Sequence, residues 1–112
     1  MYEYKAKIVK VIDGDTVDVT IDLGFSITIE ERIRFYGINC PETRTSDKIE
    51  KARGIQSKAF TESKLPVGKT VTLQSKVFDK EKYGRILADV IVDGVNLNQE
   101  LLKEGLAVPF MV

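Results

Sequence analysis

The stretch "KIEKARGIQSKAFTESKL", residues 48–65, decides the fold class because it is the longest segment with helical periodicity. Small and apolar residues recur along it at steps of three and four, which predicts a helix with one buried face. The predicted inner face consists of Ile49, Ala52, Gln56, Ala59, Phe60 and Ser63. Asp47 with Glu50 resembles an N-terminal capping box, and Pro66 followed by Gly68 ends the helix.

Strand-like segments lie on both sides of this helix. The clearest of them, residues 17–23, alternates apolar residues with Asp18, Thr20 and Asp22, which is the period of a half-buried strand. The other segments with strand composition are residues 5–12, 29–36, 70–78 and 86–92. The turns and loops that connect them are predicted at residues 13–15, at Gly24, at residues 79–85 and at residues 93–94. A short helix is predicted over residues 96–105, between an asparagine cap and a terminal glycine.

This order of elements predicts a mainly β fold. Three strands, a long helix, two strands and a short helix suit a small closed or partly closed β-barrel that carries its helices on the outside. An SH3-like barrel is the structural alternative, but it does not normally hold an 18-residue helix between its third and fourth strands. At 112 residues the chain is predicted to form a single domain, residues 1–112.

Composition excludes several kinds of chemistry. The chain has no histidine and one cysteine, so histidine-based catalytic triads and zinc sites are not expected. Lysine plus arginine number 17, as do aspartate plus glutamate, so nucleic-acid binding must depend on a local site rather than on net charge. No apolar run approaches the roughly 20 residues that cross a bilayer, and the stretch "MYEYKAKIVK" has no apolar core of the kind found in a signal peptide. We therefore expect a cytoplasmic protein without membrane contact.

Several charged residues have an ordinary surface interpretation when each is taken alone. Asp15 lies in a turn, Arg32 and Arg34 alternate along a strand as in a surface ion-pair ladder, and Glu42 and Arg85 lie in or beside loops. Their combination favours phosphodiester hydrolysis, because carboxylates suit calcium, arginines suit phosphate oxygens, and glutamate can serve as a base where histidine is absent. They spread over about seventy residues, and spacing alone does not place them together.

A resemblance to a known family extends this interpretation. The stretches "VIDGDTV", "RIRFYGINCPE", "GIQSKAFT", "DKEKYGRILADV" and "NLNQELLKEGLA" occur in this order and cover nearly the whole chain. Together they resemble the successive motifs of the staphylococcal-nuclease-like, or thermonuclease, family. The resemblance implies a five-stranded OB-type β-barrel with the long helix between strands three and four. It also implies a calcium-dependent, sugar-nonspecific nuclease that hydrolyses single-stranded DNA and RNA to leave 3′-phosphates, and a monomer is expected.

The same resemblance assigns roles residue by residue. The catalytic residues it implies are Arg34, Glu42 and Arg85, with the two arginines on phosphate and Glu42 activating water. The calcium ligands it implies are Asp15, Asn39 and Cys40, the last through its backbone carbonyl. Lys82 and Tyr83 correspond to positions that contact a terminal phosphate of the bound nucleotide. Arg32 matches no catalytic position, so its interpretation as a surface residue stands.

The sequence departs from the family pattern in four places. Asn39 replaces an aspartate ligand, which removes one negative charge and predicts a weaker metal site. Cys40 replaces a threonine or another small residue, and a nucleophilic role for it is disfavoured because no histidine can activate it. The segment from Asp15 to Arg34 is longer than in the best-known form, which predicts an extended hairpin. The chain ends without the family's last helix, and Phe110 is the aromatic residue nearest the position of its substrate-facing aromatics.

Two alternatives to an efficient nuclease remain open at this point. The first is a nucleic-acid-binding module of the same barrel fold whose catalysis is weakened, as the change to Asn39 suggests. The second is a protein-interaction barrel that has no connection with nucleic acid.

Overall fold

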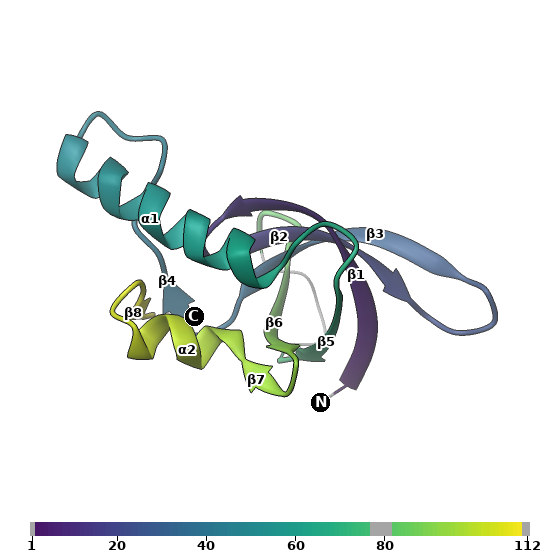
Figure 1. Cartoon of the computed structure of the whole chain (residues 1–112). Helices are drawn as coiled ribbons and strands as arrows, with labels where there is room; N and C mark the ends of the chain where they lie inside the picture. Colours follow the sequence, from purple (N-terminus) through teal and green to yellow (C-terminus); the bar gives the residue numbers. More distant parts are fainter. Residues whose placement is uncertain (1, 77–81, 111–112) are drawn as a thin grey trace.

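Strands β1 (Tyr2–Asp13), β2 (Thr16–Asp22) and β3 (Thr28–Phe35) form an antiparallel meander (Figure 1). The structure, a computed structural model, describes residues 2–76 and 82–110. The register between β1 and β2 shifts twice, after Ile8 and after Val11. Such bulges strengthen the twist of a strand, and here they let the long β1 curve so that it pairs with β2 on one side and β5 on the other.

Two further strands close the barrel. Strands β5 (Thr70–Ser75) and β6 (Ile86–Val92) pair with each other, and β5 pairs with β1, all antiparallel. Closure comes from a short parallel pairing in which Ile33 and Phe35 of β3 face Ile86 and Ala88 of β6. The result is a closed, mixed, five-stranded barrel in the order β3-β2-β1-β5-β6, which confirms the predicted OB-type fold. The predicted strand at residues 70–78 and the loop at 79–85 lie partly outside the described residues.

The core lies inside this barrel, where alternate residues of each strand point inward. Val17 and Val19 of β2, Ile33 and Phe35 of β3 and Val90 of β6 are almost completely buried. Inward and outward residues alternate with the period of two that the sequence indicated. At about 1.5–3 kcal/mol for each large apolar side chain, this core supplies most of the stabilisation.

Short elements close one end of the molecule. Strand β4 (Ile38–Asn39) pairs with β8 (Val108–Pro109), while β7 (Val95–Asn96) leads into helix α2 (Leu97–Lys103). The predicted cap of this helix is confirmed, since the Asn96 side chain accepts a hydrogen bond from the Gln99 amide. In the view of Figure 1, β4, β8 and α2 lie below the middle of α1.

Helix α1 (Lys48–Lys64) has the predicted ends but a different inner face. The Asp47 carboxylate accepts hydrogen bonds from the amides of Ile49 and Glu50, which confirms the N-terminal cap. The buried residues are Gly54, Ser57 and Thr61, which are small or polar, so the predicted inner face is wrong. The side chain of Ile49 is 70% exposed, Ala52, Gln56, Ala59 and Ser63 are also exposed, and Phe60 is only half-buried.

The physical reason is the closeness of α1 to the backbone beneath it. Thr61 Oγ1 donates a hydrogen bond of 2.7 Å to the Gly14 carbonyl, and Ser57 Oγ donates one of 2.6 Å to the Leu106 carbonyl. A helix that approaches another backbone this closely needs short side chains on its inner face, and their polar atoms need partners. The periodicity of apolar residues therefore predicted the wrong face of α1 as the buried one.

The β2–β3 hairpin projects from the barrel, away from the start of α1 (Figure 1), as the extra length of this segment predicted. Phe25 and Ser26 at its tip both have positive φ, and the amide of Leu23 donates to the carbonyl of Ile27 across the turn. The side chain of Phe25 is 98% exposed. No helix in the described part of the chain is long and apolar enough to cross a membrane.

Candidate active site

Arg34, near the end of β3, is the centre of a buried polar cluster. Its Nη1 lies 3.2 Å from Asp15 Oδ2 and donates a hydrogen bond of 3.0 Å to the Phe35 carbonyl. Its Nη2 donates a hydrogen bond of 3.0 Å to Asn39 Oδ1. Arg34 and Asp15 are only 8% and 7% exposed, so this guanidinium is held in place by a carboxylate that is itself buried. A side chain with so many partners has one orientation available to it.

Strand pairing brings these residues together. Asp15 lies in the turn between β1 and β2, and the register places Thr16 of β2 opposite Arg34 of β3. The Phe35 amide also donates to the Asp15 carbonyl at 2.8 Å, which ties the end of β3 to that turn. Asn39 follows on β4 after a tight turn at Gly37, whose φ is positive. The path of the chain thus returns Asn39 to the Arg34 side chain.

Both oxygens of the Asp15 carboxylate have partners. Oδ1 accepts a hydrogen bond of 3.0 Å from Thr16 Oγ1, and Oδ2 accepts one of 2.9 Å from the Cys40 amide. Asp15, Arg34, Asn39 and Cys40 therefore form one connected network, although the first and last are 25 residues apart in the chain. This part of the predicted site is assembled by the fold.

The Cys40 thiol is buried, and its surroundings disfavour the thiolate. Burial, together with the nearby carboxylate of Asp15, raises the pKa of this thiol to about 12. The thiol is therefore neutral near pH 7, whereas nucleophilic cysteines have a lowered pKa. The contribution of Cys40 to the cluster is the backbone amide that holds Asp15.

Glu42 lies in a groove beside the cluster. The groove, of about 350 Å³, is lined by Asn39, Cys40 and Glu42 on one side, by the start of α1 with Arg53 on another, and by Val108 of β8. The side chain of Glu42 is exposed, and it has no ion pair or hydrogen bond within residues 2–76 and 82–110. Its carboxylate is thus open to solvent next to the Arg34 network.

The backbone of Glu42 is held by an unusually close helix contact. A Cβ atom placed on Gly54 of α1 would lie 2.5 Å from the Glu42 carbonyl oxygen and 2.8 Å from that of Pro41. Only glycine permits helix and loop to approach this closely. Gly54 therefore sets the position of the loop that carries Glu42.

The aromatic ring of Phe110 also lies next to the cluster. The Cζ atom of Arg34 is 6.0 Å from the ring centroid, and the Phe110 amide donates to the Gly37 carbonyl at 2.9 Å. Phe110 is 46% exposed, so one part of the ring contacts the guanidinium while another part is open to solvent.

Arg85, Lys82 and Tyr83 form a second group just before β6. The Cζ atom of Arg85 lies 5.3 Å and the Nζ atom of Lys82 lies 5.1 Å from the centroid of the Tyr83 ring. Arg85 precedes Ile86, which faces Ile33, so in the parallel register Arg85 is level with Arg32 rather than with Arg34. These three residues form a cation-π group in the segment that leads into β6, the strand that pairs with β3.

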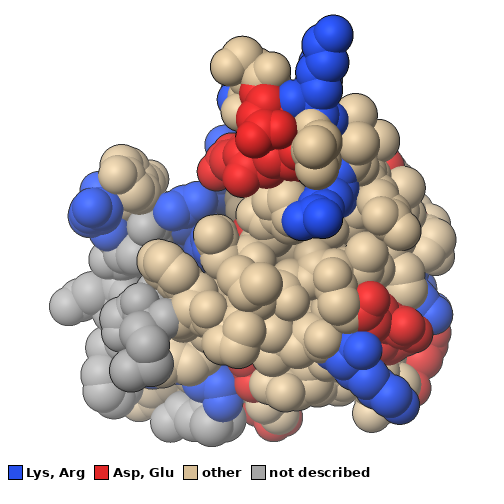
Figure 2. All heavy atoms as spheres, turned by 90° about the vertical axis from the view of Figure 1, so that its left-hand side faces the viewer, with Lys and Arg blue, Asp and Glu red and all other residues tan. Residues whose placement is uncertain are grey.

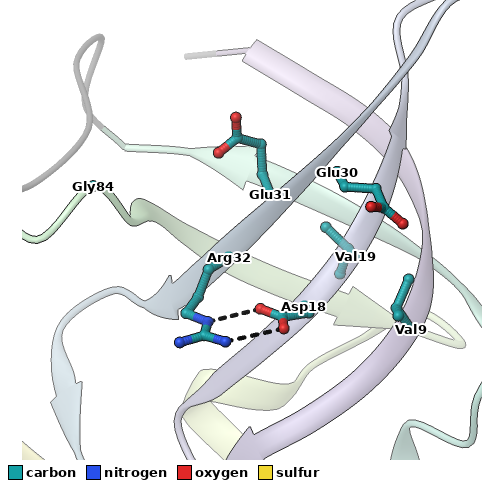
Figure 3. A pocket seen from close by; sticks show the side chains of 7 residues that line it. All are labelled: Val9, Asp18, Val19, Glu30, Glu31, Arg32 and Gly84. Atoms are coloured by element: carbon teal, nitrogen blue, oxygen red, sulfur yellow. Dashed lines mark hydrogen bonds and ion pairs between the residues drawn. The ribbon is translucent and has the colours of Figure 1, made fainter.

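Arg32 has the surface role that the sequence predicted. It forms a two-point ion pair with Asp18, with distances of 2.8 Å and 3.1 Å (Figure 3), and this hydrogen bonding raises its pKa further. The depression around this pair is also lined by Glu30 and Glu31. Because carboxylates repel phosphate groups, this depression does not suit a nucleic-acid backbone.

The three expected calcium ligands offer the oxygen atoms that calcium prefers, but together they carry only one negative charge. Carboxylate, amide and carbonyl oxygens are the ligands that calcium prefers. Asp15 is the only one of the three predicted ligands with a negative charge, and Arg34 already bonds to both Asp15 and Asn39. In the described ranges, no three Cys, Asp and Glu side chains are grouped to hold a metal ion. Two of the three expected ligands are thus already partners of Arg34.

Residues that sequence reasoning did not select complete this framework. The Asn98 side chain, completely buried, accepts from the Val90 amide and donates to the carbonyls of Tyr36 and Ala88 and to Asp89. It ties α2 to β6 and to the turn after β3. Neither Asn98 nor Gly54 stands out in a single sequence, because a polar residue in a short helix and a glycine in a long one have no distinctive pattern.

The fold and the site place this protein in the class of OB-type barrels, with a buried network of an arginine and a carboxylate at one end of the barrel. A model of the family described as staphylococcal nuclease homologue matches residues 32–112. A thermonuclease of Staphylococcus hyicus is 33% identical over 94% of this chain and 59% of its own length. An uncharacterized protein of Methanocaldococcus jannaschii is 35% identical over 93% and 58%, and the endonuclease YhcR of Bacillus subtilis is 30% identical over 98% and 9%.

The chain belongs to the staphylococcal nuclease homologue family, as the resemblance in the sequence indicated. It spans about three-fifths or less of the length of these relatives. Family membership does not test the roles of single residues, the monomeric state, the domain limits or the cytoplasmic location, all of which stay predictions.

Proposed function

We propose that this protein is a calcium-dependent, sugar-nonspecific nuclease that hydrolyses phosphodiester bonds of single-stranded DNA and RNA and leaves 3′-phosphates. The observation that carries the proposal is the Arg34 guanidinium, held by Asp15 and by Asn39, which lines the same groove as Glu42. Membership of a family that includes a thermonuclease supports it. A site that contacts the backbone rather than base edges accepts both DNA and RNA.

Arg34 binds the phosphoryl oxygens in this proposal. Its hydrogen bonds to the Phe35 carbonyl and to Asn39 Oδ1 use two of the five N–H groups of a guanidinium, and Nη1 also forms the ion pair with Asp15, so N–H groups remain for a phosphate. Because the guanidinium is already oriented, binding a phosphate requires little reorganisation. The charge that builds on the phosphoryl oxygens during the reaction thus meets a fixed cation.

Glu42 is the proposed base. Its carboxylate accepts a proton from the attacking water, the water oxygen forms a bond to phosphorus, and the bond from phosphorus to the 5′-oxygen breaks in line. The leaving 5′-oxygen takes up a proton from solvent water, and the phosphate stays on the 3′-oxygen. The contact between Gly54 and the Glu42 carbonyl supports this role, since a base must be positioned within hydrogen-bond reach of its proton.

The remaining predicted residues contribute binding. Arg85 is proposed as the second arginine that contacts the phosphate undergoing hydrolysis, and Lys82 and Tyr83 as contacts for a terminal phosphate. Asp15, Asn39 and the Cys40 carbonyl would hold calcium, which when bound supplies further positive charge to the phosphoryl oxygens. With one carboxylate in this set, we expect weak calcium affinity.

A second candidate function has a specific observation in its favour. Arg34 bonds to both side chains that are expected to hold calcium, and one of them is an amide. If calcium does not displace these contacts, the same barrel binds single-stranded nucleic acid without efficient cleavage. The two functions differ in the fate of the nucleic acid when calcium is added. The nuclease cleaves the strand, whereas the binding module binds it without efficient cleavage.

The test uses single-stranded DNA and RNA oligonucleotides with calcium or with a chelator. We expect calcium-stimulated cleavage that leaves 3′-phosphates, and its absence at high protein concentration would reject the nuclease proposal. Glu42→Gln is expected to lower the rate by about 10²–10⁴-fold. Glu62→Gln is the matched control, because Glu62 is an exposed glutamate on α1 outside the groove. Salt-dependent binding without cleavage would support the binding module instead.

Arg34→Ala tests the other half of the site. This substitution should abolish most cleavage, but it also leaves Asp15 buried without its cation, which costs about 3 kcal/mol or more. Cleavage is therefore compared at a temperature at which circular dichroism shows both proteins folded. Wild-type rates in a folded Arg34→Ala protein would contradict the proposed role.

A further inference from the structure

Arg53 is an exposed arginine that lies where two grooves meet. The first groove is the one that contains Asn39, Cys40 and Glu42. The second runs between α1 and the connection from α2 to β8, and it is lined by Gln56, Ser57 and residues 105–108. Arg53, Pro41 and Val108 line both grooves, so the two grooves adjoin at these residues.

The two grooves differ in charge. The first is lined by the carboxylates of Glu42, Asp47 and Glu50 in addition to Arg53. The second has no carboxylate among its lining residues, and Arg53 is its only charged side chain in the part of the chain that the structure describes. Figure 2 views the side on which α1 begins and β4 and β8 lie. Charges of both signs gather over the start of α1, while the middle of the face is mostly uncharged.

The guanidinium of Arg53 is available to a ligand. Arg32 and Arg34 have carboxylate partners, whereas Arg53 has no ion pair or hydrogen bond within the described ranges. The nearest acids on its own helix do not neutralise it: the Asp47 carboxylate caps the helix, and Glu50 forms no ion pair with it. An arginine that is exposed, unpaired and placed at the wall of a groove suits phosphate oxygens.

Its position relative to Glu42 is set by the backbone. Arg53 immediately precedes Gly54, whose contact with the Pro41 and Glu42 carbonyls joins α1 to this loop. The walls around Arg53 are partly apolar, because Val108 is 60% exposed and Leu106 also lines the second groove. Such walls suit the sugars and bases of a single strand whose phosphate contacts the arginine.

We propose that Arg53 forms a second phosphate subsite, in the second groove, for the chain of a single-stranded nucleic acid whose reacting phosphate lies at Arg34. The inference rests on the proposed nuclease function and extends it to the substrate beyond the scissile bond. A substrate with a single phosphodiester reaches only the Arg34 site, whereas a longer strand also reaches Arg53. The contribution of Arg53 therefore depends on substrate length.

The experiment measures binding of fluorescein-labelled oligothymidylates of two to eight nucleotides by anisotropy. It uses the Glu42→Gln background with calcium, so that the strands stay intact. Adding Arg53→Ala should weaken binding of the longer strands about tenfold and lower the salt dependence by about 0.7 in the slope of log K against log salt. Binding of the dinucleotide should not change. Arg53→Lys should recover part of the affinity.

Lys51→Ala is the matched control, since Lys51 is exposed on α1 and lines neither groove. The subsite would be overturned if the Arg53→Ala and Lys51→Ala proteins had the same affinity for strands of every length. It would also be overturned if Arg53→Ala lowered the affinity for the dinucleotide and for the octanucleotide equally. If the wild-type protein cleaves normally in that case, the nuclease proposal survives. Absence of both cleavage and binding in the parent proteins would reject the nuclease proposal and this subsite together.

Discussion

Gly54→Ala is the substitution that most directly tests how the fold positions the proposed base. The added Cβ would lie 2.5 Å from the Glu42 carbonyl oxygen, and an ordinary contact begins near 3.4 Å, so helix and loop must separate by about 0.9 Å. Overpacking of this kind costs about 1–3 kcal/mol. Alanine in place of glycine within a helix recovers about 1 kcal/mol. We therefore expect a net loss of stability of about 0–2 kcal/mol.

The effect of Gly54→Ala on cleavage should be much larger than its effect on stability. A displacement of about 1 Å in a catalytic group costs about 10²-fold in rate. Urea denaturation measures the stability change, and the rate of cleavage of a single-stranded oligonucleotide measures the displacement of Glu42. Ala52→Gly, at an exposed position on the same helix, is the control that calibrates helix propensity. A Gly54→Ala protein that cleaves within threefold of the wild-type rate would refute the reasoning.

Three further substitutions test separate parts of the site and its framework. Asn39→Asp adds a negative charge to the expected calcium ligands and should raise calcium affinity by about tenfold in isothermal titration calorimetry, whereas unchanged affinity would show that Asn39 does not bind the metal. The pKa of the buried Cys40 thiol, raised to about 12, implies that stability falls as pH rises from about 8.5, where the unfolded thiol ionises, toward 12. Cys40→Ala should reduce this fall in urea denaturation, and a difference from wild type that does not vary with pH would contradict it. Asn98→Ala removes the side-chain partner of the Val90 amide and of the Tyr36 carbonyl and should cost about 2–4 kcal/mol, so a loss under 1 kcal/mol would show that these bonds add little.

Local patterns predicted the elements of this fold well because they depend on neighbouring residues. The alternation in residues 17–23 matches the alternating burial of β2, and Asp47 and Asn96 cap the helices that follow them. The inner face of α1 was predicted wrongly, because the helix packs through Gly54, Ser57 and Thr61. Apolar periodicity locates a face that packs on a hydrophobic core, and this face packs on backbone carbonyls instead.

The candidate site could be predicted only in part and only through the family resemblance. Asp15, Arg34, Asn39 and Cys40 come together, while Arg85 contacts the Tyr83 ring before β6. That Arg34 bonds to both predicted calcium ligands is visible only in the structure, because it depends on side-chain orientation.

The sequence by itself determined the strands, the helix ends and the kinds of chemistry available, because alternation, capping and the absence of histidine are properties of the chain alone. Only the tertiary structure decided which groups meet. The β2–β3 register sets Arg34 beside Asp15, the turn at Gly37 returns Asn39 to the same guanidinium, and the missing Cβ of Gly54 lets α1 approach Glu42. The contacts of Arg34 with Asp15 and of Gly54 with Glu42 join residues well apart in sequence, and they follow from how the strands pair and the helix packs rather than from local preference.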